Sequence, residues 1–204
     1  MSKEIFEIVQ GMDPKNIETQ LAIQCAPLIA GLKISNLLII QKACLRRIKR
    51  ILRDTGISYC ILLVTEEKAT LLLYDEAQMQ EYLLKQVISD FLKQMGYQSC
   101  LLEEVLAEFG NRYRKYRRKE ILFPHEMGLL LGYPMEDVRG FIQNQGRNFL
   151  HTGYWKVYEN LAEKLRLFQQ FEMAQKTVVK LVSRGVELKD IIEAYQCSSN
   201  CAVF

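Results

Sequence analysis

The spacing of apolar residues predicts a small sheet in the N-terminal half, with helices before and after it. Two apolar runs rich in β-formers, Ile57–Val64 and Ala69–Tyr74, are joined by polar residues 65–68, which predicts an antiparallel hairpin. Leu37–Ile40 is a shorter apolar run that suits a buried strand or the start of the next helix. The hairpin is therefore the expected centre of the sheet.

Helical periodicity and helix-ending residues account for most of the remaining chain. Ser2 and Gly11 bound a short helix at Lys3–Gln10, and Asp13–Pro14 begins another. Pro27 lacks a backbone donor and disfavours helix at the residue before it, so we expect this helix to break at residues 25–27. Further helices are predicted at residues 41–53, 75–95, 102–116, 124–132, 134–146, 160–181 and 187–195.

These elements place the chain in the α+β class. We expect a small sheet with a central antiparallel hairpin flanked by helices, followed by an all-helical C-terminal half. The length of 204 residues suits a single domain, 1–204, within which an α+β lobe (1–98) and a helical lobe (99–204) can be distinguished.

Composition excludes several classes of protein. An apolar fraction of 49%, a charged fraction of 25% and a net charge of +3 are ordinary for a soluble domain and give no general argument for nucleic-acid binding. The N-terminus does not have the pattern of a secretory signal, and the longest apolar runs are too short to span a membrane. We therefore expect a cytoplasmic protein with reduced cysteines and no membrane among its partners.

The segment Phe123–Tyr158 holds both histidines and the only tryptophan of the chain. His125–Glu126 stands at a predicted helix start, where the helix dipole favours a neutral imidazole and an ionised carboxylate. That suits a metal ligand, a general base or a ligand-orienting group, and equally a histidine that only bonds the neighbouring loop. Leu129 stands where a zinc protease motif requires a second histidine, so that class is excluded.

Three aromatic residues and one cation stand close together at Gly153–Tyr158. In an extended chain, Tyr154 and Lys156 would share one side with Tyr158, and Trp155 would point to the core. One interpretation is a stacking wall with a cation for a planar anionic ligand. The other is a core tryptophan beside a lysine whose stem lies along apolar surface.

A candidate nucleophile precedes the expected helix break. Cys25 lies near Lys33 in sequence, and a thiol at a helix N-terminus near a lysine would have a lowered pKa. With His125 as base and Glu126 as its orienting group, it could form a thiol-dependent site. A buried structural cysteine is the alternative, since free cysteines are often buried.

Two features raise the question of nucleic acid. Residues 124–146 can be aligned with a helix-turn-helix, but the second helix opens with Glu136 and Asp137, which phosphates would repel. Arg112–Lys119 carries six basic residues, which could contact RNA or an acidic partner or could form an ordinary solvated helix face. Nucleic acid is therefore not the expected partner.

The motifs resemble those of a bacterial family of unknown function. The N-terminal motif is Cys25–Ala26–Pro27 through Ala30–Gly31–Leu32–Lys33. The second motif lies in Phe123–Tyr158 and consists of Phe123–Pro124–His125–Glu126, Gly128–Leu129, Leu131–Gly132–Tyr133–Pro134, Glu136–Asp137–Val138, Gly140–Phe141–Ile142 and Gly153–Tyr154–Trp155–Lys156–Val157–Tyr158. They are similar to domain of unknown function 3793, found mainly in anaerobic Firmicutes. The resemblance implies a cytosolic bacterial protein, which argues against prenylation at the C-terminal Cys201–Phe204.

The function expected from the sequence is binding of a small anionic or metal-containing ligand in a cleft between the two motifs. Cys25, His125 and Glu126 are the catalytic candidates of a thiol-dependent enzyme, and Lys33, Tyr154, Trp155 and Lys156 are the candidates for ligand contact. The alternative is a non-catalytic interaction protein that uses the Arg112–Lys119 face. The sequence assigns no cofactor, metal or oligomeric state.

Overall fold

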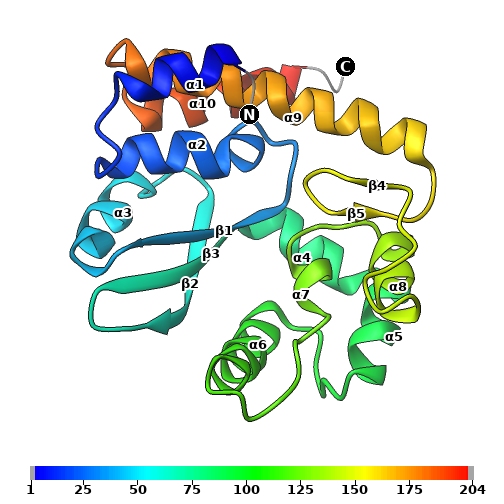
Figure 1. Ribbon diagram of the computed structural model, residues 1–204. Helices are drawn as coiled ribbons and strands as arrows, with labels where there is room; N and C mark the ends of the chain where they lie inside the picture. Colours follow the sequence, from blue (N-terminus) through cyan, green and yellow to red (C-terminus); the bar gives the residue numbers. More distant parts are fainter. Residues whose placement is uncertain (1–2, 202–204) are drawn as a thin grey trace.

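The computed structural model describes residues 3–201 as a sheet between two layers of helices (Figure 1). The elements of the N-terminal half are α1 (Lys3–Gln10), α2 (Ile17–Ile29), β1 (Ser35–Gln41), η1 (Lys42–Cys44), α3 (Leu45–Ile51), β2 (Ile57–Val64), β3 (Lys68–Asp75), α4 (Glu76–Leu84) and α5 (Gln86–Gln94). Those of the C-terminal half are α6 (Leu102–Arg117), α7 (Met127–Leu130), α8 (Met135–Gln143), β4 (His151–Thr152), β5 (Lys156–Val157), α9 (Leu161–Ser183) and α10 (Leu188–Cys201). The α+β class with a small hairpin-centred sheet is confirmed.

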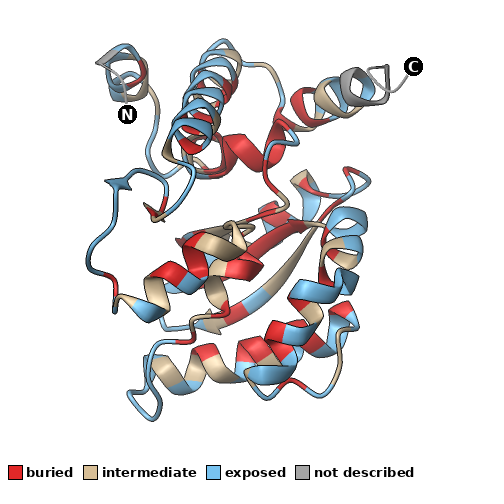
Figure 2. Cartoon of the chain, turned by 90° about the vertical axis from the view of Figure 1, so that its right-hand side faces the viewer, coloured by how far each residue is buried: buried red, intermediate tan, exposed pale blue. Residues whose placement is uncertain are grey.

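The sheet is antiparallel, with strand order β1-β3-β2. Successive side chains of the central strand β3 point to opposite faces of the sheet. Leu71 and Leu73 enter a core that contains the buried residues of α2, whereas Leu72 and Tyr74 enter a second core formed with α6. Figure 2 shows the buried residues gathered on the sheet and on the helix faces turned towards it. The two cores explain why β3 is apolar throughout.

The two ends of the chain meet on one side of the sheet. In Figure 1, α9 and α10 lie beside α1 and α2, and the N-terminal end of α9 lies near α8, to which Lys164 is joined through Glu136. Val178 and Val179 of α9 share the first core with Leu21 and Cys25 of α2. The first core is therefore built from both halves of the chain.

The predicted break of α2 at residues 25–27 is wrong, because the helix continues through Pro27 to Ile29. Proline has no N–H, so the carbonyl of Ile23 loses its normal helical partner. The side chain of Gln175 in α9 replaces that donor, with its Nε2 atom 2.6 Å from the Ile23 oxygen. A tertiary hydrogen bond thus makes a proline tolerable inside a helix.

Two further predictions differ from the structure. The helix predicted at 75–95 is divided at Lys85, whose backbone is extended with ψ 128°, and both pieces direct apolar residues into the second core. The C-terminal half also contains the short hairpin β4–β5, which the predicted all-helical pattern did not include. Most of the Cys201–Phe204 tail lies outside the described residues. None of the helices within 3–201 has the length and apolarity that a membrane crossing requires.

We predict that Gln175→Ala lowers the free energy of unfolding by about 1–2 kcal/mol, because it leaves a backbone carbonyl of α2 without a donor. In a Pro27→Ala background the loss should be smaller, since the N–H of the new alanine can donate to Ile23. Urea denaturation of the four proteins of this double-mutant cycle measures the difference. Exposed Gln170→Ala on the same helix is the control. Equal losses in both backgrounds would contradict this account.

Candidate functional site

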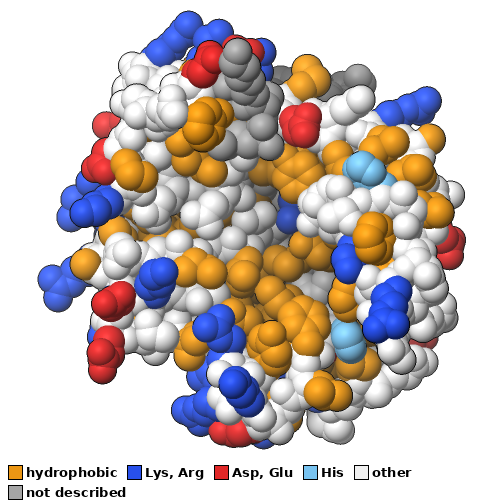
Figure 3. Space-filling model, viewed as in Figure 1, with side chains coloured by type: hydrophobic (Ala, Val, Ile, Leu, Met, Phe, Trp, Pro, Cys, Tyr) orange, Lys and Arg blue, Asp and Glu red, His pale blue; other side chains and the backbone are white. Residues whose placement is uncertain are grey.

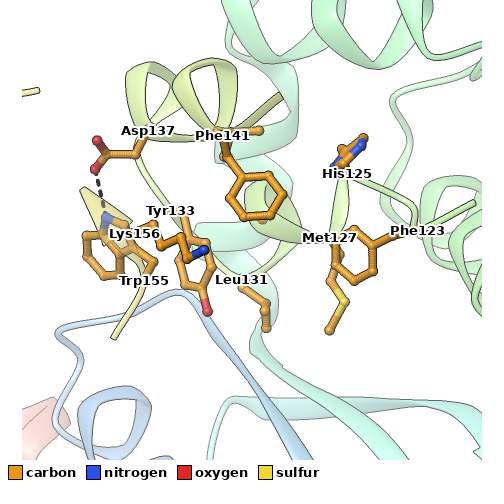
Figure 4. A pocket seen from close by; sticks show the side chains of 11 residues that line it. Phe123, His125, Met127, Leu131, Tyr133, Asp137, Phe141, Trp155 and Lys156 are labelled. Atoms are coloured by element: carbon orange, nitrogen blue, oxygen red, sulfur yellow. Dashed lines mark hydrogen bonds between the residues drawn. The ribbon is translucent and has the colours of Figure 1, made fainter. Parts of the chain in front are cut away.

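A small pocket opens between α7, α8 and the β4–β5 hairpin. Its volume is about 270 Å³, and its walls are mostly aromatic and aliphatic: Phe123, His125, Met127, Gly128, Leu131, Tyr133, Asp137, Val138, Phe141, Trp155 and Lys156. Figure 4 shows Trp155 and Tyr133 on one side of this pocket. His125 and Phe123 lie on the other side, with Phe141 between. We call it the aromatic pocket. In Figure 3 the face drawn is hollowed at its centre, with hydrophobic side chains lining the hollow and basic ones beside it.

Asp137 fixes the position of the tryptophan. It lies in the first turn of α8 and is 2% exposed. Its Oδ2 accepts a hydrogen bond from Trp155 Nε1 at 2.7 Å, and its Oδ1 accepts from the backbone N–H of Tyr158 at 2.7 Å and of Glu159 at 3.3 Å. Three donors on one buried carboxylate compensate for its lost hydration. Asp137 therefore ties α8 to the hairpin.

Tyr133 and α7 form the adjoining wall. The Tyr133 ring stacks on Trp155 with centroids 5.0 Å apart. Gly132 ends α7 with a φ of +70°, and a Cβ there would lie 2.9 Å from a carbon of Ile34, so a larger residue would displace the wall from the sheet. Ser35 of β1 donates to the carbonyl of Leu130, which anchors α7 to the sheet edge.

Lys156 and His125 bring nitrogen donors to this apolar pocket. The Lys156 Nζ atom donates to the carbonyl of Gly146 at 2.6 Å and lies 4.8 Å from the ring centroid of Phe149. Among the described residues, no carboxylate forms an ion pair with Lys156. The Nδ1 atom of His125 is buried and has no hydrogen-bond partner in that same part of the chain.

Tyr154 does not line the aromatic pocket. The expected alternation placed Tyr154 and Lys156 on one side, but residues 153–155 form the bend between β4 and β5 and do not alternate as a strand. Tyr154 packs against Phe168 and Phe171 of α9, at centroid distances of 5.4 and 5.0 Å. It lines a separate groove, which does not include Trp155 or Lys156.

Glu126 does not orient His125. The carboxylate is 1% exposed and accepts hydrogen bonds from the Tyr97 hydroxyl at 3.2 Å and from Arg112 Nη1 at 3.4 Å. No hydrogen bond joins it to His125, whose ring instead contacts Phe123 and Phe141. Glu126 thus connects α7 to α6 and to the loop before it. The expected orienting contact is absent from these described residues.

Cys25 is fully buried in the first core and does not line the aromatic pocket. Burial raises the pKa of its thiol to about 12, although Lys33 and Asn36 oppose the change. The expectation of a lowered pKa is therefore wrong, because the helix does not end at Cys25 and its environment is apolar. No hydrogen bond between Cys25 and His125 is present in the described residues.

Lys33 is the nearest link between the two sequence motifs. Its ammonium lies 5.5 Å from the Tyr133 ring centroid and donates to Asn36 Oδ1 at 3.2 Å. The side chain does not line the aromatic pocket itself, but it reaches the pocket wall through Tyr133. It is 8% exposed and has no carboxylate in ion-pair distance among residues 4–197. Burial lowers its pKa to about 8, and the neighbouring Cys25 opposes this.

Some side chains of the basic face Arg112–Lys119 form hydrogen bonds within the protein. Arg112 bonds Glu108, Glu126 and the carbonyl of Met95. Arg114 donates to Asn111 and to the carbonyl of Leu62 in the sheet. Two of the six basic residues, Arg112 and Arg114, therefore make contacts within the protein. The other four, Lys115, Arg117, Arg118 and Lys119, are exposed. No group of three or more potential metal-ligating side chains was found in the described part of the chain.

Comparison with known proteins gives the family. A family model described as "Protein of unknown function (DUF3793)" matches residues 21–192, so the chain belongs to this family and the resemblance is confirmed. The comparisons with curated proteins and with solved structures found no match.

We predict that Lys33→Met raises the free energy of unfolding at pH 7. A pKa shift from 10.5 to about 8 corresponds to ~3 kcal/mol, an upper bound on the gain. Below pH 8 the folded and unfolded states both carry the charge, so the cost of burying it is fully present. Between pH 8 and 10.5 the folded state loses its proton first, so the advantage of the variant should shrink.

Chemical denaturation across this pH range measures that difference. Lys164→Met is the matched control, because Lys164 is also buried but pairs with Glu136 at 2.9 Å, and its loss should lower stability. A constant advantage of Lys33→Met at every pH would contradict the assignment.

We also predict that Asp137→Asn lowers the free energy of unfolding by roughly 2 kcal/mol, because an amide replaces a charged acceptor of three hydrogen bonds. Trp155 is the only tryptophan, so its emission reports the same site directly and should shift towards that of a solvated indole. Asp90→Asn, at an exposed position on α5, should change neither property measurably. An unchanged emission in Asp137→Asn would refute the anchoring role.

Proposed function

We propose that this member of the DUF3793 family binds a small, flat anionic ligand in the aromatic pocket. The observation that carries the proposal is the pair of nitrogen-bearing side chains, Lys156 and His125, in a pocket whose other walls are largely apolar. His125 Nδ1 donates to an anion when it carries the imidazole proton. Neither side chain has an acidic partner among the described residues. An anion between them would supply one, and ligand pockets typically combine an apolar wall with few convergent polar groups.

The shape of the pocket favours a single ring system. Its volume of about 270 Å³ lies near the lower end of ligand pockets, which begin at roughly 300 Å³. Tyr133 and Phe141 are half-buried rings that a planar ligand can contact, and Trp155 supports Tyr133 by stacking on it. Asp137 also lines the pocket, but its oxygens already accept three hydrogen bonds, so it acts on the ligand through the position of Trp155.

The buried charge of Lys33, which lies behind Tyr133 in the pocket wall, also favours an anionic ligand. A buried ammonium without a carboxylate partner is costly, and an anion close by would reduce that cost. Its 5.5 Å approach to the Tyr133 ring places this charge next to the pocket and not within it. The proposed site is therefore smaller than the cleft expected from the sequence. Lys33 does not contact the ligand in this proposal, but its positive charge attracts the anion across the Tyr133 ring.

The proposal does not include a thiol-dependent reaction. Burial keeps Cys25 protonated at neutral pH, and its side chain lies in the first core, where Asn36 Nδ2 of β1 approaches its sulfur at 3.6 Å. The proposal does include a location in the bacterial cytoplasm, which rests on the family resemblance and on the free thiols of five cysteines: Cys25, Cys44, Cys60, Cys100 and Cys197.

The test uses aromatic carboxylates as probes. We predict that benzoate or 2-naphthoate changes the emission of Trp155, and that the matching amides bind about tenfold more weakly because they lack the charge. Lys156→Met should weaken carboxylate binding by a similar factor, and Lys156→Arg should retain most of it. Lys49→Met, at an exposed position on α3, is the charge control. Equal affinity for acid and amide would refute the anion site.

A further inference from the structure

The second groove lies on the other side of the bend that separates Tyr154 from Trp155. It has a volume of about 530 Å³ and runs between the β4–β5 hairpin and α9. Tyr154 and Phe168 form its aromatic wall, Glu172 and Gln175 contribute polar groups, and His151 stands at the hairpin. It has no lysine or arginine in its lining. We call it the α9 groove.

The wall of the α9 groove is held firmly by packing. Tyr154 contacts Phe168 and makes an edge contact with Phe171, yet it remains 36% exposed. Gly153 permits this approach, since a Cβ there would lie 2.3 Å from a ring carbon of Phe168. The hairpin is therefore pressed against α9, and the exposed part of Tyr154 is presented in a fixed position.

The charge of the α9 groove is opposite to that of the aromatic pocket. Glu172 lines it and has no lysine or arginine within ion-pair distance among the described residues. Glu172 follows Phe168 by four residues on α9, so both side chains lie on one face of the helix, and both line the groove together with Tyr154. Burial first, and then the charge of Glu172, raises the pKa of Tyr154. The amide nitrogen of Gln175 is occupied by the carbonyl of Ile23. The groove therefore offers a carboxylate beside aromatic rings and lacks a strong cation.

From this arrangement we propose that the α9 groove is a second binding site, for a small organic cation with an ammonium group. Glu172 would neutralise the charge, and the rings of Tyr154 and Phe168 would contact the methyl or methylene groups around the nitrogen. Cations bind over the faces of aromatic rings through the ring quadrupole, and aromatic walls with a nearby carboxylate suit ammonium ligands. This site is independent of the anion site proposed above, because the two share no lining residue.

The experiment compares the affinity of the protein for choline with its affinity for the uncharged isostere 3,3-dimethylbutan-1-ol. Binding is measured by isothermal titration calorimetry or by NMR titration. We expect choline to bind and the alcohol to bind about tenfold more weakly. Glu172→Gln should weaken choline binding at least about fivefold, and Tyr154→Leu should weaken it while keeping the apolar packing. Thermal melting of each variant establishes that it is folded.

Glu193→Gln is the matched control, because it removes the same charge from α10, outside the groove. Unchanged choline affinity in Glu193→Gln, together with a loss in Glu172→Gln, supports the site. Equal binding of choline and the alcohol would overturn the proposal, as would equal choline affinity in the wild type and Glu172→Gln. Titration with benzoate in the same variants separates the two sites, since failure of one leaves the other unaffected.

Discussion

The carboxylate of Asp137 is the contact on which both candidate sites depend. It holds the indole of Trp155 through Nε1 and the backbone of Tyr158 and Glu159 through their N–H groups. These bonds fix the hairpin against α8, so the bend at residues 153–155 has a defined orientation. Trp155 is thereby turned into the aromatic pocket and Tyr154 towards α9. One buried acid thus determines that Trp155 lines the aromatic pocket and that Tyr154 lines the α9 groove.

The position of Lys33 behind Tyr133 depends on a second compensation, at Pro27. Because α2 continues through this proline, its last carbonyls are available to the following loop. The Pro27 oxygen accepts from the N–H groups of Leu32 and Lys33, which folds the loop back on the helix and brings Lys33 beneath Tyr133. Gln175 supplies the bond that the proline removes. The position of Lys33 therefore depends on a contact between α2 and α9, from opposite halves of the chain.

The sequence predicted the parts of this molecule that depend on local pattern. Strand period, helix ends at glycine and the Asp75 cap are local properties, and the sheet and most helices follow from them. The continuity of α2 required a side chain from residue 175, so no local rule could predict it. The same applies to Asp137: an acid in a first helical turn is normally explained by the helix dipole, and its partner Trp155 is distant in sequence. The lowered pKa expected for Cys25 failed for this reason too, since its burial in the first core is a tertiary property of the fold.

The two buried lysines give a physical criterion for separating structural from functional charges here. Lys164 forms an ion pair with Glu136, and although burial opposes it, this bond holds the pKa of Lys164 above its usual value. Lys33 has only the neutral amide of Asn36, and its pKa falls. A protein selected for stability alone would pair or replace the second lysine, because an uncompensated buried charge is unfavourable. The unpaired Lys33 lies next to a pocket that Lys156 and His125 also line, and the proposed anionic ligand would supply the compensating charge.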